Sequence, residues 1–372
     1  MLFDGTSARF VPTGHIIFAR RDSLWAVPFD PDRLEVAGQA QPIVEHVQVN
    51  SGGLALFTVS ADGTLAYVPG AVGTRRSLVW VDRQGREEPI NAPLRAYNSL
   101  RLSPEGTRAA LEVREQDNDI WIWDFARPTL TRFTFDTAID GFPVWTPDGR
   151  RIAFGSDRAG SINMFWQSAD GTGAAERLLE SAKAQVPLAF SPDGTRLVFE
   201  EAATKTGSDL GLLALEGQRR AEPLVQTTFN EVHADISPDG SWLAYQSDES
   251  GQAEIYVRPF RAADGGRRQI SSGGGNQPLW ARSGRELFYL ALDGRLMNVS
   301  VKTSPGFAAS EGTTVLAARY YIAGRGSRSY DVSPDGQRFF MIKEGGPPGQ
   351  TSGQIIVVRP WFEELKRRVP IK

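Results

Sequence analysis

The chain has 372 residues, with 41 Lys plus Arg against 44 Asp plus Glu and a formal net charge of −3. This near balance gives no electrostatic reason to expect nucleic acid or an anionic membrane surface as the partner. The absence of cysteine excludes disulfides, thiolate metal sites and cysteine nucleophiles. The N-terminus lacks the basic and apolar pattern of a signal peptide. No apolar run approaches the roughly 20 residues that span a bilayer, so we expect no direct membrane insertion.

A Pro-Asp-Gly-like turn recurs along the chain. The clear copies are residues 60–63, 103–106, 146–149, 191–194, 237–240 and 333–336, and two degenerate copies are residues 11–14 and 281–284. The turn glycines fall at 14, 63, 106, 149, 194, 240, 284 and 336, which gives spacings of 43 to 52 residues. Proline presets the first corner of such a turn, and glycine accepts the left-handed conformation that closes a hairpin. The period is that of one propeller blade.

Each turn is followed by apolar residues at alternating positions, such as Leu197 with Phe199 and Leu243 with Tyr245. This period of two predicts a strand with one buried face. A third apolar segment follows at residues 23–27, 77–81, 119–123, 254–257 and 354–358, and a shorter one at 177–179 and 268–270. Each repeat therefore predicts four strands with the turn between the first and the second.

We predict an all-β fold: a β-propeller of four-stranded antiparallel blades that forms a single domain over 1–372. Eight blade-like repeats are favoured, with six or seven as alternatives. The last repeat has no clear fourth strand, so Met1-Leu2-Phe3 would complete it and close the ring. The rival arrangement keeps the first two repeats separate from a six-repeat ring. Residues 361–368 predict a short C-terminal helix that caps the ring, with a basic end suited to a helix C-terminus.

The repeated turns, together with segments such as 145–154 and 237–248, resemble the propeller repeats of TolB-like proteins. Residues 10–15, 78–85 and 361–366 are also similar to the C-terminal sensor region of bacterial membrane-anchored serine/threonine kinases. The resemblance implies a periplasmic or extracytoplasmic binding or sensor module, expected as a monomer. The kinase motifs of that family are missing from this chain. Fold resemblance alone is weak evidence for function.

Catalytic and metal-binding patterns are weak in this sequence. No Gly-x-Ser-x-Gly elbow is present, and His15, His46 and His233 do not form a metal-ligand motif. His15 and His46 are interpreted as ordinary strand residues, His15 on the surface, whereas His233 begins a first strand where side chains can face the channel. Residues 115–119 faintly resemble a calcium loop but lack its glycine and glutamate. We therefore expect no cofactor, read Asp119 as a strand start, and assign most tryptophans to the core.

The favoured function is non-enzymatic recognition of a protein, peptide or cell-envelope ligand. The alternative is a propeller-type hydrolase, lactonase or lyase with a metal in the central channel. Recognition residues usually lie on loops held by a rigid scaffold, here just before the first strand of each blade. The predicted ligand-binding residues are Tyr97, Asn98, Asp140, Glu231, His233, Asn276, Gln277, Arg328 and Tyr330.

Overall fold

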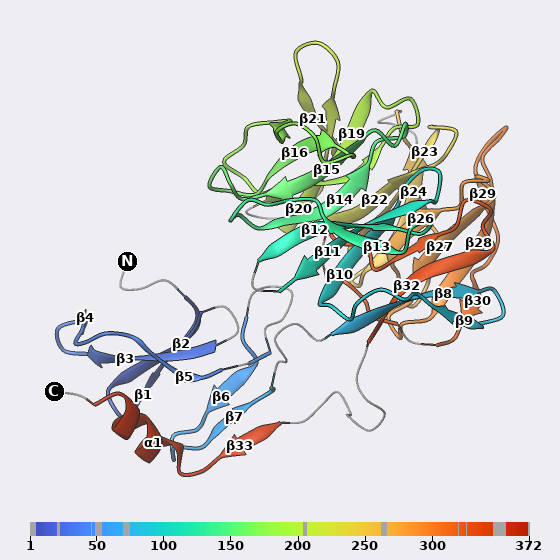
Figure 1. Cartoon of the computed structure of the whole chain (residues 1–372). Helices are drawn as coiled ribbons and strands as arrows, with labels where there is room; N and C mark the ends of the chain where they lie inside the picture. Colours follow the sequence, from blue (N-terminus) through green and yellow to red (C-terminus); the bar gives the residue numbers. More distant parts are fainter. Residues whose placement is uncertain are drawn as a thin grey trace. The chain divides into compact units, whose positions relative to one another are not determined.

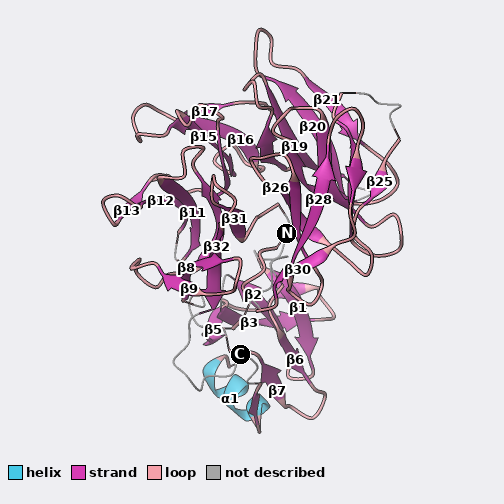
Figure 2. Ribbon diagram, turned by 90° about the vertical axis from the view of Figure 1, so that its right-hand side faces the viewer, coloured by secondary structure: helices cyan, strands magenta, loops and turns pink. Residues whose placement is uncertain are grey.

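The computed structural model describes residues 5–20, 23–45, 47–48, 54–69, 75–115, 117–203, 207–261, 266–318, 320–324, 326–344 and 355–370. These residues form thirty-three strands and one short helix, which confirms the all-β prediction (Figures 1 and 2). The interpretations of Met1-Leu2-Phe3 and His46 lie outside the described residues. The chain divides into two compact units. The ring unit is Arg76–Glu344, and the discontinuous unit combines Met1–Arg75 with Gly345–Lys372.

The ring unit contains six antiparallel sheets among the described residues, numbered here one to six in ring order. Sheets one to three are β10 (Tyr97–Leu102), β11 (Arg108–Arg114), β12 (Asn118–Asp124) and β13 (Thr129–Arg132); β14 (Asp140–Trp145), β15 (Arg151–Ser156), β16 (Asn163–Ser168) and β17 (Glu176–Arg177); and β18 (Gln185–Phe190), β19 (Arg196–Ala203), β20 (Gly207–Ala214) and β21 (Ala221–Val225).

Sheets four to six complete the unit in the same strand order. They are β22 (Glu231–Ile236), β23 (Trp242–Ser247), β24 (Glu254–Pro259) and β25 (Arg268–Gln269); β26 (Asn276–Trp280), β27 (Glu286–Leu290), β28 (Leu296–Lys302), β29 (Ala308–Ala309) and β30 (Thr313–Leu316); and β31 (Tyr330–Val332), β32 (Arg338–Glu344), β8 (Arg76–Asp82) and β9 (Glu87–Pro89).

Apolar clusters join each sheet to the next and close the ring. Trp145 and Phe154 of sheet two pack with Ile120 of sheet one, and equivalent clusters join sheets two to three, three to four, four to five and five to six. The last cluster places Trp80 and Phe340 of sheet six with residues of β10 and β11 in sheet one. The face-to-face packing expected of propeller blades is therefore present around the whole ring.

The strand that completes sheet six corrects the predicted closure. β8 pairs with β32, with Arg76 opposite Glu344, so the blue strand lies beside the orange one in Figure 1. The segment predicted as the last repeat's third strand forms β33 (Ile356–Val358) and instead pairs with β7 (Leu65–Tyr67) of the second repeat. The two repeats thus exchange third strands. The single ring predicted over 1–372 is replaced by six sheets in one unit and two repeats in another, as in the rival arrangement.

The physical reason for this exchange is burial. The four central residues of β8, Leu78 to Val81, are all buried, whereas β33 is mostly exposed. An apolar strand gains most where sheets cover both of its faces, which the ring provides. β8 and β33 have similar sequence patterns, so the pattern did not show which of the two joins the ring.

The discontinuous unit packs two small sheets and the helix around one core. Its elements are β1 (Thr6–Val11), β2 (His15–Arg20), β3 (Ser23–Asp30), β4 (Glu35–Val36), β5 (Gln41–Val44), β6 (Phe57–Val59), β7, β33 and α1 (Trp361–Arg368). The helix has the predicted bounds and a basic last turn, and its Trp361 and Leu365 are buried against residues of this unit.

His15, predicted on the surface, is fully buried in this unit. Its Nε2 lies 2.7 Å from the Val369 carbonyl oxygen, and Thr13 Oγ1 lies 3.0 Å from its Nδ1. The ring nitrogen that faces the carbonyl must donate, so the other nitrogen accepts from Thr13. A partner 354 residues away in sequence, just after the helix, explains why the local pattern missed the burial.

The repeated turns have the predicted chemistry and also lock neighbouring sheets together. In the second sheet Thr146 Oγ1 donates to Asp148 Oδ1 at 2.6 Å and accepts from the Arg151 amide at 3.0 Å. A Cβ added to Gly106, whose φ is +75°, would lie only 2.6 Å from Pro334 Cγ of the neighbouring turn. Further glycines approach the preceding turn's proline at Gly149, Gly194, Gly240 and Gly284. At those four positions an added Cβ would lie 3.6 to 3.9 Å from the proline, an ordinary contact, so close approach requires glycine at Gly106, whereas the turn conformation favours it at all five.

Candidate functional site

The two ends of the ring differ in their exposed side chains. We call loop face the end where fourth strands connect to the next sheet and second strands connect to third strands. The turn face is the opposite end, with the Pro-Asp-Gly turns. Among the described residues of the ring unit, all the large apolar side chains found exposed lie in connections of the loop face. They are Leu94, Phe135, Ile139, Phe229, Leu292 and Ile322.

A segment of the chain itself covers the centre of the loop face. This covering segment, residues 320–324 and 326–329 between β30 and β31, contacts the innermost strands of several sheets. The Tyr321 hydroxyl donates to Asn98 Oδ1 at 2.8 Å, and Gln277 Nε2 donates to the Ala323 carbonyl at 2.9 Å. A Cβ on Gly326 would lie 3.1 Å from side-chain atoms of both Phe142 in sheet two and Val186 in sheet three. Since these strands surround the ring axis, the segment lies across the channel mouth.

Four of the predicted ligand-binding residues are brought together at this segment, and one of them, Arg328, belongs to it. Asn98 donates to Glu112 Oε1 at 3.0 Å and to Ser327 Oγ at 3.2 Å. Gln277 accepts from the Ser329 amide at 3.0 Å, and the Tyr330 hydroxyl donates to the Gln277 carbonyl at 2.8 Å. Arg328 donates to the Pro278 carbonyl and lies 3.5 Å from Asp235. All four are buried, so they hold the covering segment in place rather than stand open to solvent.

Three further predicted residues line the same end of the ring. Tyr97 is buried and its hydroxyl donates to the Pro93 carbonyl at 2.6 Å. His233 and Asn276 are half-buried. His233, Gln277 and Phe142 share one repeat position and all have positive φ, between 51° and 58°. Register shifts at these positions are bulges in the first strand, which redirect a side chain next to the channel.

Asp140 and Glu231 occupy equivalent positions in two different junctions between sheets. Asp140 is fully buried at the junction of sheets one and two, where Arg158 donates to both of its carboxylate oxygens at 3.0 and 2.9 Å. Burial raises the pKa of Asp140, and the bonds from Ser156 and Arg158 oppose that rise. Glu231, at the junction of sheets three and four, accepts from Thr227 and is equally buried. Burial raises its pKa to about 7.

A charged cluster at the ring centre was missed by the sequence reasoning. One position of the repeat lies three residues before the second residue of each turn. It holds Arg101, Asp235 and Asp331 in three of the sheets and an apolar residue in the others. Asp331 accepts from the Leu102 amide and Asp235 from the Trp280 amide, both at 2.8 Å. Burial lowers the pKa of Arg101 to about 9, helped by Arg328. A charge recurring at one normally apolar repeat position is the signal that could have found this cluster.

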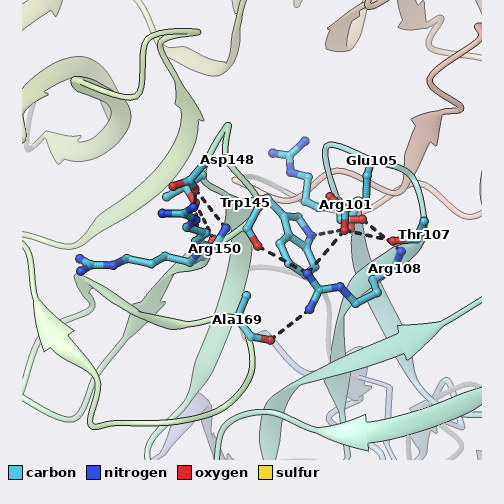
Figure 3. Close-up of polar contacts among 12 residues, drawn as sticks. Arg101, Glu105, Thr107, Arg108, Trp145, Asp148, Arg150 and Ala169 are labelled. Carbon is cyan, nitrogen blue, oxygen red and sulfur yellow. Dashed lines mark hydrogen bonds and ion pairs between the residues drawn. The ribbon is translucent and has the colours of Figure 1, made fainter.

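At the turn face an arginine crosses from sheet one to sheet two, as Figure 3 shows. Arg108 of sheet one lies over the Trp145 ring of sheet two at 4.8 Å. Its guanidinium also donates to the Ala169 and Gly149 carbonyls, both at 3.4 Å. The Trp145 indole in turn donates to the Arg101 carbonyl at 3.0 Å. The tryptophans Trp80, Trp123, Trp145, Trp280 and Trp361 are buried, which confirms their predicted core role.

Within the described ranges, no group of three or more His, Asp or Glu side chains is placed to hold a metal ion. The metal-dependent alternative therefore stays an untested prediction. In the described part of the chain, no helix has the length and apolar character needed to span a bilayer.

Comparison with solved structures identifies the ring as a TolB-like β-propeller fold. A protein assigned as TolB from Agrobacterium tumefaciens superposes with a TM-score of 0.60 at 16% identity, over 73% of this chain and 99% of that chain. TolB from Acinetobacter baumannii gives a TM-score of 0.47 at 16% identity, over 89% and 79%. An oligogalacturonate lyase from Vibrio parahaemolyticus gives 0.49 at 11% identity, over 76% and 96%. Such identities show the fold alone.

Sequence comparison finds only partial relatives. The chain is 26% identical over 203 residues to the uncharacterized peptidase YuxL of Bacillus subtilis, covering 42% of this chain and 31% of that protein. It is 28% identical over 174 residues to the uncharacterized protein Atu1656 of Agrobacterium fabrum, covering 45% and 57%. The chain thus spans less than two thirds of the length of these relatives. No family model matches.

Proposed function

We propose that this chain is a binding module that recognises a protein or peptide partner through the loop face of its propeller. The observation that carries the proposal is the gathering of exposed apolar side chains at that end of the ring. Phe135 is 72% exposed and Leu292 is 57% exposed, and both lie in connections held at each end by strands of the ring. Exposed apolar groups on loops of a rigid scaffold are typical of interaction surfaces.

The covering segment supports a surface rather than a deep pocket as the recognition element. It is held across the channel mouth by the bonds of Gln277 and Tyr321 and leaves Ile322 at 37% exposure. A partner would then contact the rim loops and the outer side of this segment. Large apolar and aromatic anchors dominate the affinity of such contacts. The TolB-like resemblance further supports a location outside the cytoplasm, which cell fractionation of the native protein would test.

Site-specific photocrosslinking tests the proposal. A photoreactive residue is placed at Phe135 or Phe229 on the loop face, and at Arg150 on the turn face as the matched exposed control. Each variant is irradiated in envelope extract of the source organism. We expect one discrete adduct from positions 135 and 229 that is absent from 150 and is competed by unlabelled chain. Adducts from 150 alone, or from none of the three, would contradict a loop-face partner.

A further inference from the structure

The junction of sheets one and two is a template for how this ring neutralises buried carboxylates. Asp119 is the second residue of β12 and Asp140 the first residue of β14, and both are buried. Arg132 contacts Asp119 at 2.6 Å, and Arg158 contacts Asp140 at 2.9 Å. The Arg158 guanidinium also lies over the Phe154 and Phe165 rings, at 5.5 and 5.0 Å. The chain thus supplies one arginine for each buried acid.

The junction of sheets three and four repeats the acids without these arginines. Asp209 has the same repeat position beside β19 as Asp119 has beside β11. Glu231 likewise has the same repeat position as Asp140. Arg158, eleven residues after Pro147, is replaced by Glu249, eleven residues after Pro238. The fourth-strand position that Arg132 holds in sheet one is held by Pro223 in sheet three. The aromatic pair is kept, as Tyr245 and Tyr256 with ring centroids 5.9 Å apart.

The backbone framework of the two junctions is otherwise the same. The Ile139 amide donates to Asp157 Oδ1 at 2.8 Å in the first, and the Asn230 amide donates to Asp248 Oδ1 at 2.9 Å in the second. The difference is therefore in charge rather than in geometry. Of the neighbouring cations, Arg267 is bonded to Glu249 and Lys183 to Glu201, each at 2.6 Å, and Asp209 accepts from Gln226 at 3.0 Å.

A second observation points to a missing ligand group. Glu231 is 1% exposed, and its Oε2 has no hydrogen-bond partner, although Oε1 accepts from Thr227. A buried carboxylate oxygen without a donor is costly, since nearly all such groups are paired in folded proteins. Thr227, which bonds the carboxylate, is exposed together with its neighbours in 226–229, so an incoming side chain can reach the carboxylate by exchanging places with Thr227.

We propose that the junction of sheets three and four is a binding site for a cationic group, a guanidinium or ammonium, carried by the partner's peptide chain. The partner's cation would take, beside Glu231 and Asp248, the place that Arg158 fills in the first junction. The raised pKa of Glu231 is consistent with a carboxyl that lacks its counter-ion. Phe229, 39% exposed beside the site, belongs to the loop-face surface, so this inference rests on and deepens the proposed function.

The test uses a small probe, Nα-acetyl-arginine amide, with the uncharged citrulline analogue as its control. Binding to the full chain is measured by isothermal titration and by the shift in melting temperature. We expect saturable binding of the arginine probe only. Glu231→Gln should weaken it about tenfold, because a charge-assisted bond is lost. Glu249→Arg should also weaken it, because the chain then supplies its own arginine as in the first junction.

Matched variants separate the two junctions. Asp248→Asn should weaken the arginine probe, whereas Asp157→Asn, at the equivalent position of the neutralised junction, should leave it unchanged. Circular dichroism confirms that each variant is folded. Equal binding of the citrulline analogue, no saturable binding by the wild type, or full binding by Glu249→Arg would overturn the cation site. A crosslinked loop-face partner that persists in those circumstances would leave the proposed function standing.

Discussion

The two ends of the propeller show how one repeat separates stability from recognition. At the turn face, glycines, prolines and arginines of neighbouring sheets interlock, as between Gly106 and Pro334 or Arg108 and Trp145. At the loop face the connections vary in length and carry the exposed apolar side chains of the ring unit. The comparison teaches that the repeated motif holds the ring together, whereas the non-repeated loops are free to specify a partner.

The largest effect is expected at the interlocked turns. Gly106→Ala forces a side chain into a φ of +75° and places Cβ 2.6 Å from Pro334 Cγ. The backbone strain and the clash together should lower the free energy of unfolding by about 3 kcal/mol. The control is Gly171→Ala, where φ is +79° but no atom lies within 4 Å, with an expected cost of about 1 kcal/mol. Equal losses in urea unfolding would show that the turns do not lock the sheets.

The next effect concerns pH and the junction of sheets three and four. Burial, with help from Asp209 and Asp248, raises the pKa of Glu231 from 4.5 to about 7. The folded carboxyl keeps its proton to higher pH than the unfolded one, so the free energy of unfolding falls as pH rises from about 4.5 to about 7. The drop should be about 1–2 kcal/mol after allowance for screening. Glu231→Gln should flatten this part of the profile in melting curves at pH 5 and 8, and an unchanged profile would contradict the assignment.

A smaller loss is expected from the arginine that crosses between sheets one and two at the turn face. Arg108→Met keeps the aliphatic stem over Trp145 but removes the charge and the two 3.4 Å bonds to Ala169 and Gly149. We expect a cost of about 1 kcal/mol, measured by urea unfolding. Arg150→Met, on an exposed side chain of the same face, is the control. A loss of unfolding free energy smaller than that of the control would show that Arg108 does not help to hold the sheets together.

The smallest effect on stability is expected at the loop face. Phe135→Ser and Phe229→Ser change exposed side chains and should alter the free energy of unfolding by no more than about 0.5 kcal/mol. Both should nevertheless reduce capture of the loop-face partner in the crosslinking experiment. A large loss of stability would mean that these side chains serve the fold and not recognition.

Local chemistry made the turns and the strand order within each repeat predictable. Thr146 and Asp148 form their turn through side chains two residues apart, and such short-range bonds are visible in sequence. The exchange of β8 and β33 was not predictable in this way, because both are short apolar strands and their partners lie far along the chain. The loop face was predicted as the candidate site, but residues such as Asn98 and Gln277 lie under the covering segment. That segment has no counterpart in the other repeats, so no sequence pattern predicted it.

Hydrogen exchange of the full chain with and without its captured partner tests the central claim most directly. We predict slower exchange in the loop-face connections 133–139, 226–230 and 291–295. Exchange in the turns 146–149, 191–194 and 237–240 should stay unchanged. Protection confined to those turns, or no protection anywhere in residues 76–344, would contradict recognition through the loop face.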